Sequence, residues 1–264
     1  MHCRVLSKFW SCDTLRDSTP RFCSCVPRGG INRAHLCAHC SLVAMDLRFA
    51  HPCTGLIVGG TGAGKSYFTK RLIEQRAELF DTVFEHIIFY YSEWQPLYES
   101  LSETESVEFR QDIPRLEDHP PRMGPKLIII DDFMDEIKEH HKEILKFYIK
   151  GSHHRNLSVF FLSQCLFPEG LRQISLNSHY IVLFKATRDR AQIRTFCLQV
   201  DPNQWRALHE AYEDATQLGY SYILFDFKPN QKDHLRMRTK IFPDESTVVY
   251  VPREKYKRSL EGIE

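Results

Sequence analysis

Short runs of consecutive apolar residues alternate along this chain with segments whose apolar residues recur at helical spacing. Runs with little polar interruption are typical of strands that are buried on both faces of a parallel sheet. They predict strands at 54–58, 86–91, 107–109, 126–131, 157–162, 180–184 and 222–227. The helical spacing predicts helices at 66–80, 136–149, 189–199 and 201–217. Strands that alternate with helices predict an α/β fold, with a mainly parallel sheet flanked by helices on both faces.

The pattern divides the chain into three parts. It begins at Met45 and ends near Pro252, so we expect one domain over residues 45–252. Residues 1–44 are rich in cysteine and show no periodicity, which predicts either a disordered extension or a translated upstream region with Met45 as the true start. Residues 253–264 read as a charged, loose tail.

Between the predicted strand 54–58 and the predicted helix 66–80 lies a match to the phosphate-binding pattern G-x-x-x-x-G-K-[ST]. Backbone N–H groups at a helix N-terminus bind phosphate oxygens, and glycines let the loop wrap closely because they carry no Cβ. In this pattern Lys65 reaches the β- and γ-phosphates and the hydroxyl of Ser66 ligates Mg²⁺. The alternative is a chance glycine-rich turn. The segment predicts a P-loop NTPase that binds ATP and Mg²⁺ through Gly59, Gly60, Thr61, Gly62, Ala63, Gly64, Lys65 and Ser66.

An acidic pair ends the apolar run 126–131. An acid at this place lies at the carboxyl edge of the sheet, where nucleotides bind in open α/β folds. We expect Asp131 to hold Mg²⁺, directly or through water, and Asp132 to act as the general base on the attacking water. The alternative is a pair of acids that only begin a helix, since Asp is common near helix N-termini.

Two further polar residues flank the predicted strand 157–162. Gln164 follows it, where an amide beside the P-loop could sense the γ-phosphate or hold the attacking water; the alternative is a surface Gln at a strand end. Arg155 precedes it and could reach the γ-phosphate of a neighbouring subunit as an arginine finger, or else be solvated or bind DNA.

Composition narrows the class of protein. Hydrophobic residues make up 42% of the chain, as in an ordinary globular protein, and the formal net charge is +1, so a polyanion would have to bind a local patch. No stretch approaches the roughly 18 apolar residues of a membrane-spanning helix, and no apolar signal-peptide region begins the chain. We therefore expect a soluble intracellular protein without membrane contact.

Cysteine is concentrated at the N-terminus. Six of the nine cysteines lie in the first 40 residues. The pairs Cys23/Cys25 and Cys37/Cys40, with His35 and His39 nearby, are compatible with a zinc site, although a single residue between Cys23 and Cys25 is a poor spacing for one. The alternative is a disordered extension or a translated upstream region with Met45 as the true start.

The chain carries both the P-loop pattern and the acid pair that an ATP site needs. In this combination it resembles the FtsK/HerA superfamily of DNA-pumping ATPases. Within it, the chain is most similar to the poxvirus-type genome-packaging ATPases, which Polinton (Maverick) elements also encode. The P-loop and the acid pair are generic, whereas the segments around Gln164 and at 176–185 are the specific part. The resemblance covers about residues 47–200 and includes the segments 51–54, 94–98, 156–159, 164–167 and 176–185.

The resemblance implies an ATP-hydrolysing ring motor, a homo-oligomer of five or six subunits, that moves double-stranded viral or element DNA into a capsid. A capsid protein would be a further partner, and the host nucleus, the cytoplasm or the virion the place of action. One position departs from the wider superfamily, because many members carry Glu where this chain has Asp132.

Two other functions stay open at this point. A small-molecule or nucleotide kinase would also carry a P-loop, and Arg188, Arg190 and Arg194 lie late in the chain, where such kinases place a lid. The acid pair and Gln164 instead favour water as the acceptor, hence hydrolysis. A nucleotide-gated scaffold without activity is the third possibility, against which the intact Lys65 argues.

Overall fold

The structure is a computed structural model. It describes residues 25–28, 31–35, 46–102, 107–120, 124–131, 136–167 and 172–253, and for residues 25–28, 31–35, 136–139 and 153 it describes the backbone alone.

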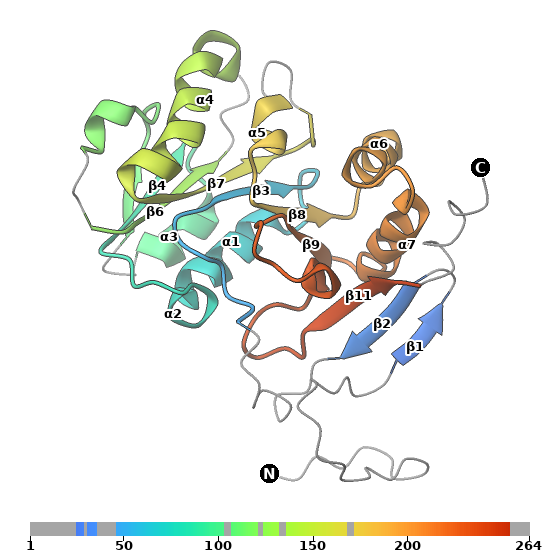
Figure 1. Ribbon diagram of the computed structural model, residues 1–264. Helices are drawn as coiled ribbons and strands as arrows, with labels where there is room; N and C mark the ends of the chain where they lie inside the picture. Colours follow the sequence, from blue (N-terminus) through green and yellow to red (C-terminus); the bar gives the residue numbers. More distant parts are fainter. Residues whose placement is uncertain are drawn as a thin grey trace.

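In the described part of the chain, 11 strands form one sheet in the order β1-β2-β11-β10-β9-β8-β3-β7-β6-β4-β5 (Figure 1). The strands are β1 Cys25–Arg28, β2 Ile31–His35, β3 Thr54–Val58, β4 His86–Tyr91, β5 Val107–Arg110, β6 Lys126–Asp131, β7 Leu157–Ser163, β8 Tyr180–Phe184, β9 Tyr222–Asp226, β10 Met237–Thr239 and β11 Val248–Pro252. The helices are α1 Lys65–Glu74, α2 Arg76–Leu79, α3 Pro96–Ser102, α4 Glu136–Arg155, α5 Arg172–Leu176, α6 Arg190–Val200 and α7 Trp205–Ala215.

The sheet has a parallel half and an antiparallel half. Strands β8, β3, β7, β6, β4 and β5 pair in parallel, so their carboxyl ends meet at one edge. Strands β9, β10, β11, β2 and β1 continue the sheet in antiparallel pairs. The fold is thus α/β with a mixed sheet, and the predicted parallel sheet forms one half of it.

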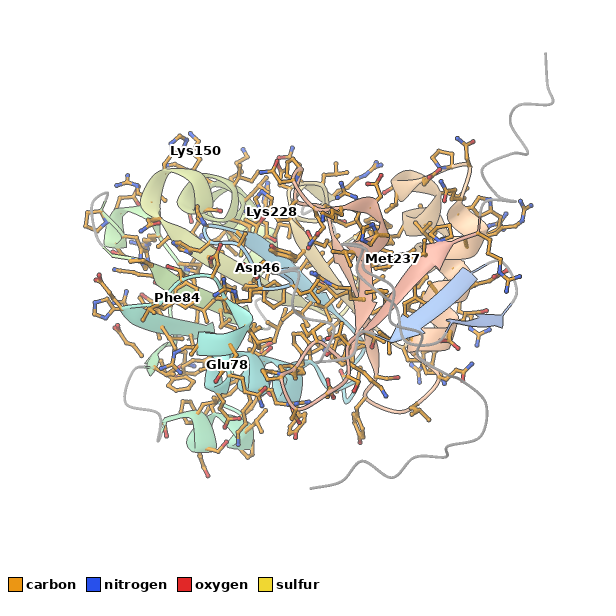
Figure 2. All side chains as sticks on the ribbon, turned by 60° about the horizontal axis from the view of Figure 1, so that its bottom comes forward. Asp46, Glu78, Phe84, Lys150, Lys228 and Met237 are labelled. Carbon is orange, nitrogen blue, oxygen red and sulfur yellow. The ribbon has the colours of Figure 1, made fainter. Side chains whose placement is uncertain are left out.

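Helices cover both faces of the sheet, so two apolar cores form (Figure 1). Side chains alternate between the faces along each strand. On β6, Ile128 and Ile130 belong to the core that also contains residues of α4, α5, α6 and α7, whereas Leu127 and Ile129 belong to the core that contains residues of α1, α2 and α3. Figure 2 labels one residue of each core: Phe84 belongs to the core on one face of the sheet, and Met237 belongs to the core on the other face. Among the described helices, none is both long enough and apolar enough to cross a membrane.

The apolar runs predicted the parallel strands within one or two residues, but three helices differ by several residues from their expected bounds. The predicted helix 66–80 divides at Gln75, whose backbone (φ −103°, ψ 23°) leaves the helical region. The predicted helix 201–217 begins only at Trp205, because Asp201 Oδ1 accepts hydrogen bonds from the backbone N–H groups of Asn203 (2.8 Å) and Gln204 (3.1 Å). This side chain thereby stabilises a turn ahead of the helix.

Helix α4 is longer than expected. It continues to Arg155, past the predicted end at residue 149. Gly151 lies directly against the following strand, since a Cβ added there would come within 3.2 Å of Leu157 Cδ1. Close packing on β7 therefore sustains a helical turn that helix propensity alone disfavours.

The segment 1–44 contributes to the sheet, which differs from the expectation that it lies outside the fold. Strand β2 pairs antiparallel with β11, for example Ala34 with Val249, and β1 pairs with β2. Figure 1 shows these two strands in blue beside β11 in red. The other residues of segment 1–44, and residues 254–264 of the predicted tail, fall outside the described residues.

A buried ion pair joins two strands of the antiparallel half. Arg238 on β10 donates from Nη2 to Oδ2 of Asp226 on β9 (2.8 Å), and the two side chains are 0% and 1% exposed. Burial lowers the pKa of Arg238, and the Asp226 carboxylate opposes this. Asp226 also accepts a hydrogen bond from Gln231 Nε2 (2.7 Å), so the guanidinium depends on a carboxylate that is itself held in place.

We expect Asp226→Asn to lower the free energy of unfolding by about 3–5 kcal/mol, because it leaves a buried guanidinium without its counter-charge. The measurement is denaturant unfolding followed by circular dichroism. The matched control is Asp233→Asn, which breaks an exposed pair with Arg236 (2.9 Å) and should cost less than about 1 kcal/mol. Equal losses in the two variants would contradict this account of the buried pair.

A buried histidine packs beneath the parallel half. His119 is 1% exposed, and its Nε2 lies 3.0 Å from the hydroxyl of Tyr90. Among the described residues its Nδ1 has no hydrogen-bond partner. Burial, aided by the positive charges of Lys126 and Arg110, lowers the pKa of His119 to about 4. The folded protein therefore holds this imidazole neutral at a pH where an exposed one is charged.

Stability should fall as the pH falls from about 6.5 to about 4, because over this range the unfolded chain binds a proton at His119 and the folded chain does not. The loss should reach at most about 3 kcal/mol and level off below pH 4, where the folded state is also protonated. His119→Phe should flatten the dependence of the melting temperature on pH. The exposed His154 is the control, and a slope unchanged by His119→Phe would contradict the assignment.

Candidate functional site

The predicted phosphate-binding loop leaves the sheet from β3 and is fixed to the neighbouring strand β7. The N–H of Gly59 donates to the carbonyl oxygen of Ser163 (3.1 Å), which extends the pairing of the two strands one residue further. A Cβ at Gly59 would lie 2.8 Å from Cβ of Phe184 and 3.0 Å from Cβ of Ala63. A side chain does not fit there, so the loop needs glycine at this point.

The loop then turns through backbone conformations that favour glycine. Gly62 has φ 73° and Gly64 has φ 108°, both in the left-handed region. An added Cβ at Gly60 or Gly62 would meet nothing within 4 Å, so the outer side of the loop is open. Helix α1 begins at Lys65 behind this turn, and no side chain caps its N-terminus. Because the loop is open and no side chain caps the helix, the backbone N–H groups at this N-terminus could bind the phosphates of a nucleotide.

The two polar side chains of the motif lie at the start of α1. Lys65 Nζ donates to the carbonyl oxygens of Gly59 (2.7 Å) and Gly60 (3.3 Å), which holds the ammonium across the loop. Ser66 Oγ donates to Oε1 of Gln95 at 3.4 Å. The start of α1 therefore carries a positive charge and a hydroxyl, the groups that would bind the phosphates of a nucleoside triphosphate and its magnesium ion.

Asp131 ends β6, on the other side of β7 from the loop. Its pairing with Leu162 of β7, which pairs in turn with Ile57 of β3, places the three strand ends side by side. Its carboxylate is on the face that α1 and α3 cover, and it accepts a hydrogen bond from the hydroxyl of Tyr98 (2.7 Å). Asp131 is 3% exposed and Tyr98 is 1% exposed, so this contact fixes the carboxylate away from bulk water.

The segment that leads into α3 contacts both predicted magnesium ligands. Gln95 contacts Ser66, and Tyr98 contacts Asp131. An oxygen ligand set of one carboxylate and one hydroxyl is what Mg²⁺ prefers alongside phosphate oxygens. The spacing of residues in the sequence did not predict that Gln95 and Tyr98 contact these ligands. The one sequence signal was that the segment 94–98 belongs to the family resemblance.

The other predicted site residues lie apart from one another. Gln164 is exposed and directly follows Ser163, whose carbonyl anchors the loop, so the structure brings it next to the P-loop. Arg155 ends α4 at the amino end of β7, which is the opposite edge of the sheet. Seven residues of strand separate these edges, a length of about 20 Å, so Arg155 cannot reach the P-loop of its own subunit. Asp132 falls outside the described residues, and its role stays a prediction.

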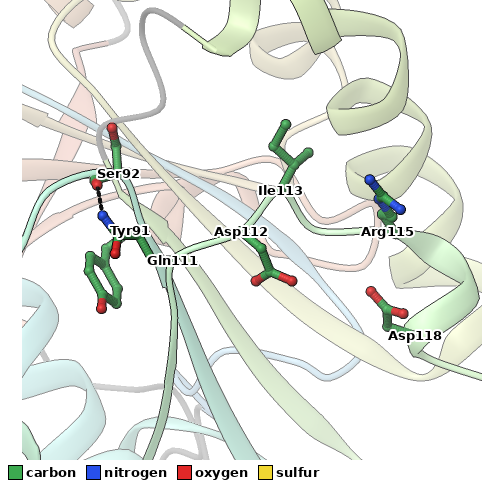
Figure 3. A pocket seen from close by; sticks show the side chains of 7 residues that line it. All are labelled: Tyr91, Ser92, Gln111, Asp112, Ile113, Arg115 and Asp118. Atoms are coloured by element: carbon green, nitrogen blue, oxygen red, sulfur yellow. Dashed lines mark hydrogen bonds between the residues drawn. The ribbon is translucent and has the colours of Figure 1, made fainter.

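Cavities of about 620, 410 and 260 Å³ lie on the described part of the carboxyl edge. The cavity of about 620 Å³ lies beyond β4 and β5, and no P-loop residue lines it (Figure 3). Asp112, Arg115 and Asp118 line it, and Gln111 Nε2 donates across one side to the carbonyl oxygen of Ser92 (3.0 Å). The cavity of about 260 Å³ lies beyond β8 and is lined by Lys185 and Arg190. The cavity of about 410 Å³ adjoins the predicted P-loop at Gly64, and of these three it alone is lined by a P-loop residue.

The predicted zinc site cannot be placed. Cys23, Cys37, His39 and Cys40 fall outside the described residues, and Cys25 lies in β1, where only the backbone is described. Among the described side chains, no group of three or more His, Cys, Asp or Glu could hold a metal ion. The zinc hypothesis therefore stays a prediction.

No protein-family model matches the chain, and neither does any curated protein. Among solved structures, it is similar to B204, the DNA-packaging ATPase of Sulfolobus turreted icosahedral virus, at 15% identity and a TM-score of 0.46, over 76% of this chain and 98% of that one. B204 of Sulfolobus turreted icosahedral virus 2, in complex with ATP-γS, has 16% identity and a TM-score of 0.39, over 66% and 92%.

The cytoplasmic domain of the type VII secretion ATPase EccC of Thermomonospora curvata has 13% identity and a TM-score of 0.47, over 75% of this chain and 25% of that one. These similarities are too low to assign a function. A function has to be inferred from the residues of the site.

We expect Tyr98→Phe to weaken Mg²⁺-dependent binding of ATP about 10- to 100-fold, because the Asp131 carboxylate loses the donor that orients it. The measurement is a titration of ATP binding against Mg²⁺ concentration. The control is Tyr148→Phe, which removes another buried hydroxyl, hydrogen-bonded to Ser178 (2.8 Å), without touching Asp131. Equal shifts in both variants would mean that Tyr98 is only structural.

Proposed function

We propose that this chain is a P-loop ATPase that hydrolyses Mg-ATP at the carboxyl edge of β3, β7 and β6. The observation that carries the proposal is the geometry of the loop 59–66: an open glycine turn, anchored to β7 and followed at once by a helix whose first residue is Lys65. Phosphate binding requires this combination, and a chance glycine-rich turn does not explain the anchoring or the helix behind it.

Each residue has a distinct task in this proposal. The loop N–H groups and the Lys65 ammonium bind and orient the terminal phosphates. Ser66 and Asp131 hold the magnesium ion, with Gln95 and Tyr98 positioning them. Bound Mg²⁺ supplies charge neutralisation at the phosphate oxygens. Asp132 takes the proton from the attacking water, and Gln164 orients that water. Water as the acceptor distinguishes this scheme from a kinase.

We further propose that the ATPase drives the packaging of double-stranded DNA, as the sequence resemblance implies. The support lies in the segments around Gln164 and at 176–185, the part of the chain on which that resemblance chiefly rests. In this proposal the subunits form a ring with a capsid protein as partner. Arg155 lies too far from its own P-loop, so it would act only on the nucleotide of the neighbouring subunit.

Lys65→Ala should reduce the ATPase rate at least about 100-fold and weaken ATP binding, because a charge-assisted contact to the phosphates is lost. Asp132→Asn should reduce the rate about 10²- to 10⁴-fold while Mg-ATP still binds, because an amide cannot accept the proton. The measurements are phosphate release and ATP binding, each with and without linear duplex DNA. The control is Lys70→Ala on the same helix, whose ammonium contacts Ser100 (3.0 Å) outside the loop.

A wild-type rate in Lys65→Ala would overturn the ATPase proposal. A rate that duplex DNA leaves unchanged would overturn the packaging proposal alone.

A further inference from the structure

The cavity of about 410 Å³ beside the P-loop is formed by segments that are distant in sequence. Gly64 and Tyr67 contribute from the start of α1, and residues 217–222 contribute from the turn between α7 and β9. The remaining wall comes from Thr239, Phe242, Glu245 and Tyr250. Its volume is in the range of small-ligand sites. A ligand in this cavity would therefore lie directly against the residues that hold the phosphates.

Tyr220 stands at the junction between the cavity and the P-loop. A Cβ added at Gly64 would lie 3.2 Å from Tyr220 Cδ1, so the phenol ring is close to the loop. The ring is nevertheless 74% exposed. The backbone of Tyr220 has φ 62°, a left-handed conformation that is costly for a bulky side chain. An exposed aromatic residue in a strained backbone gains little from packing, which is typical of a position kept for a ligand.

Opposite these exposed groups, the wall of the cavity is a rigid aromatic cluster. Phe68 packs edge-to-face on Tyr222 (ring centroids 4.8 Å apart) and on Phe242 (5.2 Å). The guanidinium of Arg71 lies 3.8 Å from the centre of the Phe242 ring. Buried side chains fix this wall, whereas the second exposed ring, Tyr67 at 59%, comes from the first turn of α1. The cavity thus offers flat apolar surface on one side and accessible aromatic rings on the other.

Polar side chains also line the cavity, among them Gln217, Ser221 and Lys240. Glu245 accepts a hydrogen bond from Arg71 on Oε1 (3.3 Å), and its Oε2 is buried, so this carboxylate is not open to a ligand. A flat aromatic ligand would match the exposed rings of Tyr67 and Tyr220. The base of a nucleotide has these properties, and its stacking on aromatic side chains is favourable for every base.

We propose that this cavity binds the base of the nucleotide whose phosphates the P-loop holds, with Tyr220 stacking on it. The proposal rests on the proposed ATPase function, since it places base and phosphates in one ligand. For ATP, the ligand is adenine.

The test compares two ligands that share phosphates but differ in the base. Mg-ATP and Mg-tripolyphosphate are titrated calorimetrically into the full chain. ATP should bind more tightly, and Tyr220→Gly should weaken ATP binding about 5- to 150-fold, the range found for losing one stacked base. Tripolyphosphate binding should stay within about twofold, because it makes no contact with the cavity. Glycine adopts a positive φ readily, so this variant removes the ring and preserves the turn.

Two further variants make the result specific. Tyr220→Phe is the matched control and should retain ATP binding, since stacking uses the ring and not the hydroxyl. Tyr67→Ala, on α1 rather than on the turn, tests the second ring and should also weaken ATP binding while leaving tripolyphosphate binding unchanged.

The outcomes separate the two proposals. If the wild-type chain binds ATP and tripolyphosphate equally, or if Tyr220→Gly weakens both by the same factor, the base site is wrong and the P-loop assignment stands. If the wild-type chain binds neither ligand, the proposed function fails and this site fails with it.

Discussion

One hydrogen bond holds the candidate site together, from the N–H of Gly59 to the carbonyl oxygen of Ser163. It extends the pairing of β3 with β7 beyond the strands, so the loop leaves the sheet in a fixed direction. The packing around it tolerates no side chain at Gly59, because Phe184 and Ala63 occupy the space. Gln164 directly follows Ser163, so the same hydrogen bond also brings Gln164 beside the loop. The pairing of β3 with β7 thus sets the position and the direction of the proposed phosphate site.

The site is completed by a helix that plays no part in phosphate binding by itself. Gln95 and Tyr98 connect Ser66 on α1 to Asp131 on β6 through the start of α3. Each of these contacts is a hydrogen bond to a group that we expect to ligate magnesium. A buried carboxylate needs such a donor to remain ionised and oriented. In the proposed site, the segment 94–98 is therefore a positioning element.

The antiparallel half of the sheet lines the cavity beside the predicted P-loop. Strands β9, β10 and β11 extend the sheet away from the phosphate site, and the buried pair of Arg238 and Asp226 ties β10 to β9. Residues of this half, with the turn after α7, form the cavity beside Gly64. Phosphates and base would thus be bound by different halves of one sheet, which places the whole nucleotide across the junction at β8.

The sequence by itself determined the α/β class, the parallel strands and the P-loop, because each depends on local patterns: apolar runs, helical spacing, and glycines before a lysine. It did not predict β10 and β11, and it placed residues 25–28 and 31–35 outside the fold, because their strand structure depends on the pairing of β2 with β11 and of β1 with β2.

Only the tertiary structure decided what meets at the site. The order of the strands brings Asp131 and Gln164 to the loop and leaves Arg155 at the opposite edge. The contact of Tyr98 with Asp131, like that of Tyr220 with Gly64, joins residues far apart in the chain. Such contacts depend on how whole elements pack, and no local pattern encodes them.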